Sequence, residues 1–207
     1  MITHLLTIGV EYTGHNHIYG CAIRSADLFE HCISSKINLE CKISLRGYEA
    51  NLNKITDTIL KLMQEDDGKL IIYYAGHGNH IGNLEHWQTN SGNLNQVKLA
   101  NLLNKSKGIE TIVISESCSS EHMINAQVIR KDYMYYGATQ DYEDALISSD
   151  GGIFTLELVS IIDKLWSKNR NFTHKDVIEQ LEKSQFDCSH FSVRYSKNSI
   201  TENSFFH

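Results

Sequence analysis

Short runs of hydrophobic residues recur along the chain and indicate buried strands. The clearest are Lys69–Ala75, which reads KLIIYYA, and Thr111–Ser115, which reads TIVIS. Both are continuous apolar runs of strand length, as expected for strands that are covered on both faces. The same reasoning predicts four further strands, at His4–Glu11, Glu40–Leu45, Tyr133–Ala138 and Phe191–Tyr195.

Between these runs, hydrophobic residues return at the spacing of an α-helix, which places them on one side of the helix. In the first such segment, Ala26, Phe29 and Ile33 share a face. Asn51 and Thr173 each precede a helical segment and are expected to cap it. The predicted helices are Cys21–Ser34, a segment that starts at Leu52, Gln96–Leu103, Phe154–Trp166 and His174–Lys183.

Strands that alternate with helices predict an α/β fold with a mostly parallel six-stranded sheet and helices on both faces. The length of 207 residues suits a single domain over residues 1–207. The content of 41% hydrophobic and 21% charged residues is ordinary for a soluble globular protein. The polar stretch Gly82–Asn95 is expected to be a long loop, with Trp87 under it or facing a substrate groove.

Charge and cysteine content narrow the class of protein. The formal net charge of -6 disfavours a nucleic-acid partner, which usually requires a basic face. No hydrophobic run approaches the roughly 18 residues of a membrane span, so no membrane partner is expected. The five cysteines are widely spaced and form no CxxC pair, which favours a reducing compartment and a cytoplasmic location. The sequence leaves open whether the chain is a monomer or a homodimer.

A histidine and a cysteine follow the two clearest strands. His77 lies between two glycines after the first, and Cys118 lies between two serines after the second. Ligands of parallel sheets bind beyond the carboxyl ends of the strands, so both side chains are expected at one edge. An imidazole beside a thiol produces a nucleophile, and the N–H groups of Gly78 and Cys118 are candidates for an oxyanion hole. The flanking glycines would let the backbone approach a substrate closely.

These segments resemble the caspases and metacaspases. KLIIYYAGHGNH is similar to their histidine segment, and ETIVISESCSS is similar to their cysteine segment. LLTIGVEY, YGCAIRSADLFEHCI, YMYYGATQ and DGGIFTLELV resemble the flanking segments in the same order, so that the resemblance covers about residues 4–195. The resemblance implies the caspase-like fold, a three-layer sandwich. It also implies a cysteine endopeptidase that cleaves protein or peptide substrates with a His77/Cys118 dyad and needs no cofactor.

The motifs also depart from the family pattern. The Gln-Ala-Cys-x-Gly signature of caspases is absent. The Asp-x-Cys-His-Ser-Gly pattern of metacaspases reads Glu-Ser-Cys-Ser-Ser-Glu at residues 116–121, so the acid is kept while the histidine and glycine are not. The resemblance therefore implies a divergent member of the superfamily.

The resemblance also implies a pocket for the substrate residue that precedes the cut. The matching positions are Cys21, Arg24, Ala75 and Glu116, with Asp144 in the acidic run that matches the pocket wall. In the family two acids bind Lys or Arg by charge-assisted hydrogen bonds. Here Glu116 remains and Arg24 stands in place of the second acid, while the acidic run would favour a basic substrate. The positions that resemble the aspartate-binding arginines of caspases, Ile18 and about Leu146, are uncharged. We therefore predict cleavage after a basic residue, with Arg130-Lys131 as a candidate self-cleavage site.

Two other functions remain open. A zinc site is one alternative, and the metal content of the purified protein would identify it. Its ligands would be His77, His80, Cys118 and His122. The second is a caspase fold that binds a partner after losing catalysis, which labelling of Cys118 by a peptide electrophile would contradict. A calcium site is left unassigned because residues 94–108 contain no Asp or Glu.

Overall fold

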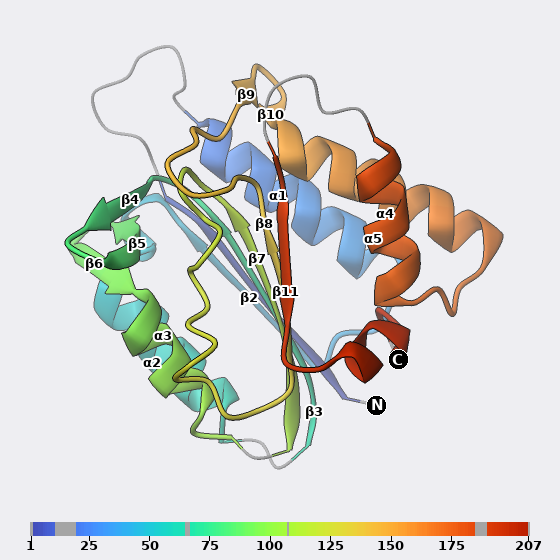
Figure 1. Ribbon diagram of the computed structural model, residues 1–207, viewed down its shortest axis with the longest axis horizontal. Coiled ribbons are helices and arrows are strands. Elements are labelled where there is room, and N and C mark those ends of the chain that lie inside the picture. The colour runs from blue at the N-terminus through green and yellow to red at the C-terminus, as the bar shows by residue number, and fades with distance from the viewer. Residues whose placement is uncertain (1, 11–19, 65–66, 107, 185–189, 207) are drawn as a thin grey trace.

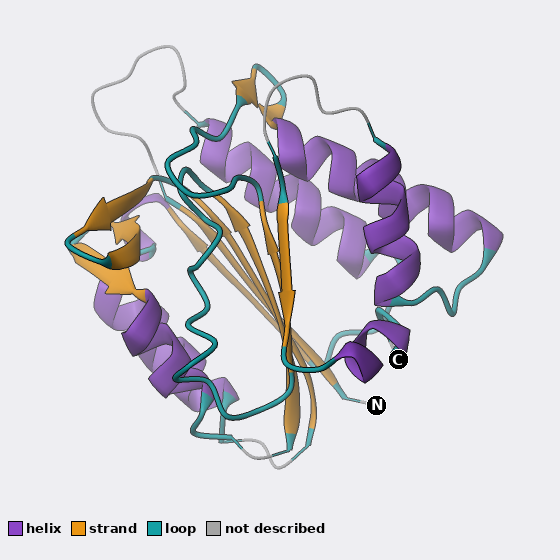
Figure 2. Ribbon diagram, viewed as in Figure 1, coloured by secondary structure: helices purple, strands orange, loops and turns teal. Residues whose placement is uncertain are grey.

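The computed structural model describes residues 2–10, 20–64, 67–106, 108–184 and 190–206. Its centre is a six-stranded sheet in the order β11-β8-β7-β3-β1-β2, in which β11 pairs antiparallel with β8 and the other pairs are parallel (Figures 1 and 2). This confirms the predicted mostly parallel sheet. The strands are β1 (Thr3–Gly9), β2 (Cys41–Arg46), β3 (Gly68–Ala75), β7 (Ile109–Glu116), β8 (Tyr133–Gly137) and β11 (Ser192–Tyr195).

Helices cover both faces of this sheet, as predicted. One face carries α1 (Cys21–Ser34), α4 (Ile153–Lys168) and α5 (His174–Lys183), and the other carries α2 (Leu52–Leu62) and α3 (Gln96–Leu103) (Figure 1). Short 3-10 turns lie at Gly47–Glu49 and Asn198–Glu202. The predicted caps are present, because the Asn51 side chain accepts from the Lys54 N–H and Thr173 forms a capping box with Asp176.

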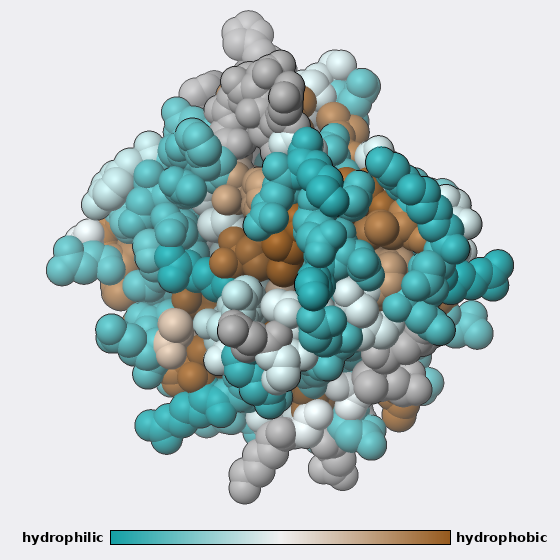
Figure 3. All heavy atoms as spheres, turned by 45° about the vertical axis from the view of Figure 1, so that its right-hand side comes forward, coloured by the Kyte–Doolittle hydropathy of each residue, from teal (hydrophilic) through white to brown (hydrophobic). Residues whose placement is uncertain are grey.

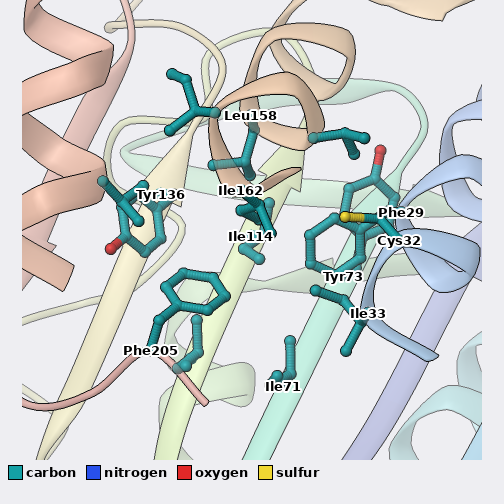
Figure 4. Packing of buried hydrophobic residues seen from close by; sticks show 14 of the residues in the cluster. Phe29, Cys32, Ile33, Ile71, Tyr73, Ile114, Tyr136, Leu158, Ile162 and Phe205 are labelled. Carbon is teal, nitrogen blue, oxygen red and sulfur yellow. The ribbon is translucent and has the colours of Figure 1, made fainter. Parts of the chain in front are cut away.

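The two faces of the sheet bury separate hydrophobic clusters. On the α1/α4 face, Phe29 stacks on Tyr73 with ring centroids 4.6 Å apart, and Leu158 and Ile162 of α4 pack over Ile114 (Figure 4). On the α2/α3 face, alternate residues of the same strands pack with hydrophobic side chains of the two helices. Continuous apolar runs in β3 and β7 thus supply both cores, because successive side chains point to opposite faces.

The polar stretch expected as a loop is instead a second sheet of three antiparallel strands. It consists of β4 (Gly78–Ile81), β5 (Leu84–Thr89) and β6 (Gly92–Asn95), beside one end of the main sheet (Figure 1). A two-residue turn joins β4 to β5, with Gly82 at a φ of 64°. The loop prediction was wrong because these strands are short and polar, and only the alternate residues Trp87 and Leu94 enter the core.

A smaller hairpin follows, formed by β9 (Ile147–Ser148) and β10 (Gly151–Gly152) directly before α4. No helix in the described part of the chain has the length and apolar character needed to cross a membrane. On the face shown in Figure 3, hydrophilic side chains surround smaller hydrophobic patches. The exposed large hydrophobic residues of the described surface are Ile2, Tyr48, Ile81, Tyr142 and Tyr195.

Candidate active site

The register of the main sheet places His77 and Cys118 at equivalent positions. Ala75 of β3 and Glu116 of β7 are the last paired residues of the two neighbouring strands, and Gly76 donates to the Glu116 carbonyl at 3.2 Å. His77 and Cys118 each follow two residues after this pair, and both are half-buried. Neighbouring strands lie about 4.8 Å apart, so the two segments leave the sheet side by side at its carboxyl edge.

The two glycines beside His77 are required by the protein's own packing. A Cβ on Gly78 would overlap the Cys118 carbonyl, and a Cβ on Gly76 would overlap the Tyr74 hydroxyl. Neither glycine has a positive φ, so the reason is close approach and not backbone conformation. The sequence predicts close approach of a substrate at these glycines, whereas at Gly78 the close neighbour in the structure is the backbone of Cys118.

Side chains under the two segments fix the histidine backbone. The Tyr74 hydroxyl donates to the His77 carbonyl at 2.8 Å and also lies 2.7 Å from the Gln88 carbonyl. Tyr74 stacks on Trp87 with centroids 4.5 Å apart, and the Trp87 indole N–H donates to Ser115 Oγ at 2.8 Å. Trp87 is therefore a buried support beneath the site and not part of a substrate groove.

The Cys118 thiol contacts the segment that the resemblance placed in the pocket wall. Sγ accepts from the Ala145 N–H at 3.3 Å, and the Asp144 side chain lies within hydrogen-bonding reach. Burial raises the pKa of Cys118, the Asp144 charge adds to this rise, and the Ala145 N–H opposes it. This environment favours the protonated thiol over the thiolate.

The backbone around Cys118 is strained. In the described residues, a positive φ outside glycine occurs at Ser119, at 46°, and at Tyr142, at 60°. Ser119 donates to the Glu143 carbonyl at 2.9 Å, which ties the loop after Cys118 to the 141–145 segment. Such conformations cost free energy and concentrate at functional sites, where the surrounding structure holds them in place.

Glu116 is buried beneath the start of α4. Its side chain is 3% exposed, and Oε2 accepts from the Thr155 N–H at 2.7 Å and from the Thr155 hydroxyl at 2.6 Å. Burial raises the pKa of Glu116 to about 7, against the effect of the Thr155 hydrogen bonds. A Cβ on Gly152 would overlap its carboxyl group. The carboxylate thus caps the N-terminus of α4 from outside the helix.

The other residues of the predicted pocket lie around Glu116. Burial raises the pKa of Cys21, with Glu116 adding to the rise and Arg24 lowering it, so both charges act on this thiol. Cys21 is buried at the start of α1, Ala75 is buried in β3, and Arg24 is exposed. The structure brings Cys21 and Glu116 together and places Asp144 at Cys118, whereas Ile18 lies outside the described residues.

A cluster of ionisable groups lies beside the dyad segments, on the β4–β6 side. His80, Glu85 and Asp141 lie with one side-chain ligand atom each within 4.8 Å of the others, and Glu121, His122 and Asp141 form a second such group. In the described part of the chain, neither His77 nor Cys118 joins a group of this kind. Among the described residues, the alternative zinc site inferred from the sequence is therefore not assembled, and His80 and His122 belong to two separate groups that share Asp141.

The acids of this cluster differ in ionisation. Glu85 is 1% exposed, and burial raises its pKa to about 9, with Asp141 and Glu121 adding to the rise. Burial also opposes ionisation of Asp141, but hydrogen bonds from Glu85 and His122 outweigh it and hold the pKa of Asp141 below its usual range. The sequence indicates His80 and His122 as possible metal ligands but does not link them to Glu85 or Asp141, because these residues come from separate segments of the chain.

The candidate self-cleavage site lies far from the dyad. Arg130 and Lys131 line a cavity of about 880 Å³ with Gly68 and Ile109, which begin β3 and β7. Cys118 follows the other end of β7, and an eight-residue strand spans roughly 25 Å. The structure therefore does not bring the predicted self-cleavage site to His77 and Cys118 of the same molecule.

Comparison with known proteins gives the fold. No family model matches this sequence, and no curated protein does. The chain is similar to a solved structure, the protein GSU0716 from Geobacter sulfurreducens, with a TM-score of 0.77 and 15% sequence identity, over 100% of this chain and 98% of that chain. At this identity the similarity concerns the fold alone, and it extends from one end of the chain to the other.

Proposed function

We propose that the chain is a caspase-like cysteine endopeptidase with His77 as the base and Cys118 as the nucleophile. One observation carries this proposal: the parallel register sets both residues two positions past the Ala75–Glu116 pair, with Gly78 against the backbone of Cys118. Nucleophilic catalysis needs a base next to a thiol. Here the two lie at the ends of adjacent strands, and the glycine allows their two loops to touch.

The reaction proceeds in two steps. His77 takes the thiol proton as Sγ attacks the peptide carbonyl carbon, and the oxygen becomes an oxyanion held by the N–H groups of Gly78 and Cys118. His77 then gives the proton to the leaving amine, the C–N bond breaks, and a thioester remains on Cys118. Water, deprotonated by His77, hydrolyses the thioester and restores the thiol.

Substrates are cleaved after Lys or Arg. Asp144 supports this preference because it is exposed and its charge acts directly on the Cys118 thiol. Glu116 contributes less than the sequence suggested, since Thr155 holds one of its oxygens, while Oε1 accepts no hydrogen bond from the described residues. A basic side chain would therefore find its main charged partner at Asp144, near the cut.

Replacement of the dyad tests catalysis. Cys118→Ala and His77→Ala are each expected to lower peptide cleavage by at least about 1,000-fold. Cys41→Ala is the matched control, because Cys41 is also half-buried but lies in β2. Unfolding in urea checks that each variant keeps its fold. Full activity of Cys118→Ala would refute the assignment.

Specificity is tested with peptides that differ only in the residue before the cut. Arg, Lys, Gln and Asp peptides are compared on the wild type, Asp144→Asn and Glu116→Gln. We expect the Arg peptide to be cleaved fastest and Asp144→Asn to lower its kcat/KM by about 10-fold, with less effect on the Gln peptide. Faster cleavage of the Asp peptide would show that the pocket is not acidic in function.

A second candidate function is a binding module that has lost catalysis. It is favoured by one observation, that Ala145 and Asp144 occupy the surroundings of Sγ in this conformation. The two candidate functions are distinguished with a peptide that carries an electrophilic carbonyl or an acyloxymethyl ketone in place of the scissile bond. Stoichiometric labelling of the wild type but not of Cys118→Ala supports the peptidase, whereas absence of both labelling and cleavage supports the binding module.

A further inference from the structure

His80 and Glu85 are placed together by the register of the β4–β5 hairpin. They are directly opposite one another in the antiparallel pairing, so their side chains lie on the same face of the hairpin. Asp141, from the loop after β8, faces this pair, and one ligand atom from each of the three residues lies within 4.8 Å of the others. Three different segments of backbone therefore bring a nitrogen and two carboxylates to one point.

Glu85 has an oxygen without a donor at this point. Its side chain is 1% exposed, and Oε2 accepts from the His122 N–H at 2.6 Å. Oε1 accepts no hydrogen bond from the described residues, and buried His80 Nδ1 is likewise without a hydrogen-bond partner among them. Two carboxylates that face each other in a buried site repel unless a proton or a cation lies between them.

His122 acts from outside this group of three. Arg194 Nη2 lies 2.7 Å from His122 Nε2, and because arginine only donates, Nε2 is the acceptor and Nδ1 carries the proton. That Nδ1–H lies 3.2 Å from Asp141 Oδ1 and 3.4 Å from Glu85 Oε1. The imidazole therefore orients the two carboxylates, as residues outside the ligand set do in metal sites.

We propose that His80, Glu85 and Asp141 bind a divalent transition-metal ion, for which Zn²⁺ is the probe. Ligand atoms at about 2.0–2.1 Å from zinc lie roughly 3.3 Å from one another, so the present spacing requires only small side-chain rotations. One imidazole and two carboxylates suit zinc, while the nitrogen disfavours calcium, which prefers oxygen ligands.

The site is open on one side. His80 and Asp141 line a cavity of about 510 Å³, together with Tyr142, Gln96 and Arg194, so water can complete the coordination sphere. The ring of Tyr142 lies over His80 at 4.9 Å and shields it on the outer side. The ion would join the β4–β5 hairpin, which follows His77, to the 141–145 segment, whose end contacts the Cys118 thiol.

Zinc binding is measured on the full chain after removal of metal by a chelator. Calorimetry and metal analysis after gel filtration are expected to give one Zn²⁺ per chain, with an increase in Tm, and millimolar Ca²⁺ is not expected to compete. His80→Ala and Glu85→Gln are each expected to weaken binding by about 100-fold. Glu85→Gln keeps the shape and an acceptor for the His122 N–H, so it is the variant least affected in folding.

Two controls decide where a bound ion sits. His31→Ala removes an exposed histidine of α1 and is expected to leave the affinity unchanged. Cys118→Ala is also expected to leave it unchanged, and because this variant lacks activity, the result is independent of the peptidase proposal. Absence of binding by the wild type, wild-type affinity in Glu85→Gln and His80→Ala, or loss of binding in Cys118→Ala would each overturn the inference.

Discussion

Glu116 and Glu85 are both buried, both next to the Cys118 loop, and lie on opposite faces of the main sheet. Glu116 faces α4 and meets two donors of Thr155, the N–H and the hydroxyl. Glu85 faces the 141 loop and meets one donor, the His122 N–H, and another carboxylate. The same residue type is thus part of the packing on one face and part of a charged cluster on the other.

The difference shows how surroundings decide the role of a buried acid. Two donors at the N-terminus of α4 hold one carboxyl oxygen of Glu116 and favour its charged form. A carboxylate that faces other acceptors is completed only by a proton or a cation. We therefore assign Glu116 mainly to holding α4 against the sheet and Glu85 to ion binding, which the following predictions test.

The largest expected difference is in stability. Glu116→Ala leaves the buried Thr155 N–H without its acceptor and removes one of the two partners of the Thr155 hydroxyl, which keeps the Tyr73 hydroxyl at 2.5 Å, and we expect a loss of about 4 kcal/mol. Glu85→Ala removes the acceptor of a single backbone donor, the His122 N–H, so we expect about 1 kcal/mol. Urea unfolding of both variants with a chelator present measures the two values. Similar losses would mean that the two glutamates do not differ in the way described.

Crowding at the start of α4 gives the next effect. A Cβ on Gly152 would overlap the Glu116 carboxyl, which cannot move away while Thr155 holds it. Gly152→Ala is expected to cost about 3 kcal/mol, as overpacking does in a dense core. When Gly152→Ala is introduced into Glu116→Ala, its cost in stability should nearly vanish, because the carboxyl group that it would overlap is gone. If the stability losses of the two substitutions simply add, the contact between Gly152 and Glu116 is contradicted. Gly82→Ala is a control that meets no atom within 4 Å, although its φ of 64° still costs some stability.

Much of this fold was predictable from hydrophobic pattern. The helix Gln96–Leu103 and the helix His174–Lys183 begin and end as expected, and β3 and β7 were the clearest strands. Their signals are local, since period and capping residues lie within each segment. The β4–β6 sheet was missed because Leu84, Trp87 and Leu94 are too few apolar residues to reveal three strands.

The site was predictable only in part. The positions of His77 and Cys118 follow from strand order, since each ends a hydrophobic run at the same edge. The contact of Asp144 and Ala145 with the thiol depends on the path of a long loop, and no local pattern encodes it. Likewise, Glu116 was expected to face a substrate, but the direction of a side chain at a strand end depends on which helix covers it.

The pH dependence of stability provides a smaller test. Burial raises the pKa of Glu116 to about 7 in the folded state, above the 4.5 of an unperturbed glutamate. The folded state therefore binds this proton more tightly, and the contribution of Glu116 to stability falls as pH rises from about 4.5 through 7. In Glu116→Gln we expect this fall in the free energy of unfolding to be smaller by on the order of 2 kcal/mol. Parallel stability curves for the two proteins between these pH values would contradict the assignment.

The smallest effect on stability is expected on the hairpin side, at Tyr74. Its hydroxyl donates to the His77 carbonyl and lies near the Gln88 carbonyl, while its ring stays stacked on Trp87 in the variant Tyr74→Phe. Loss of one neutral hydrogen bond costs about 1 kcal/mol, because the buried carbonyls lose a donor but the ring packing is kept. Catalysis should suffer more than folding, since a small shift of the base is worth up to about 100-fold in rate. A fall in kcat with little change in KM would show that Tyr74 positions the base, whereas equal losses in kcat/KM and in the amount of folded protein would reduce its role to packing.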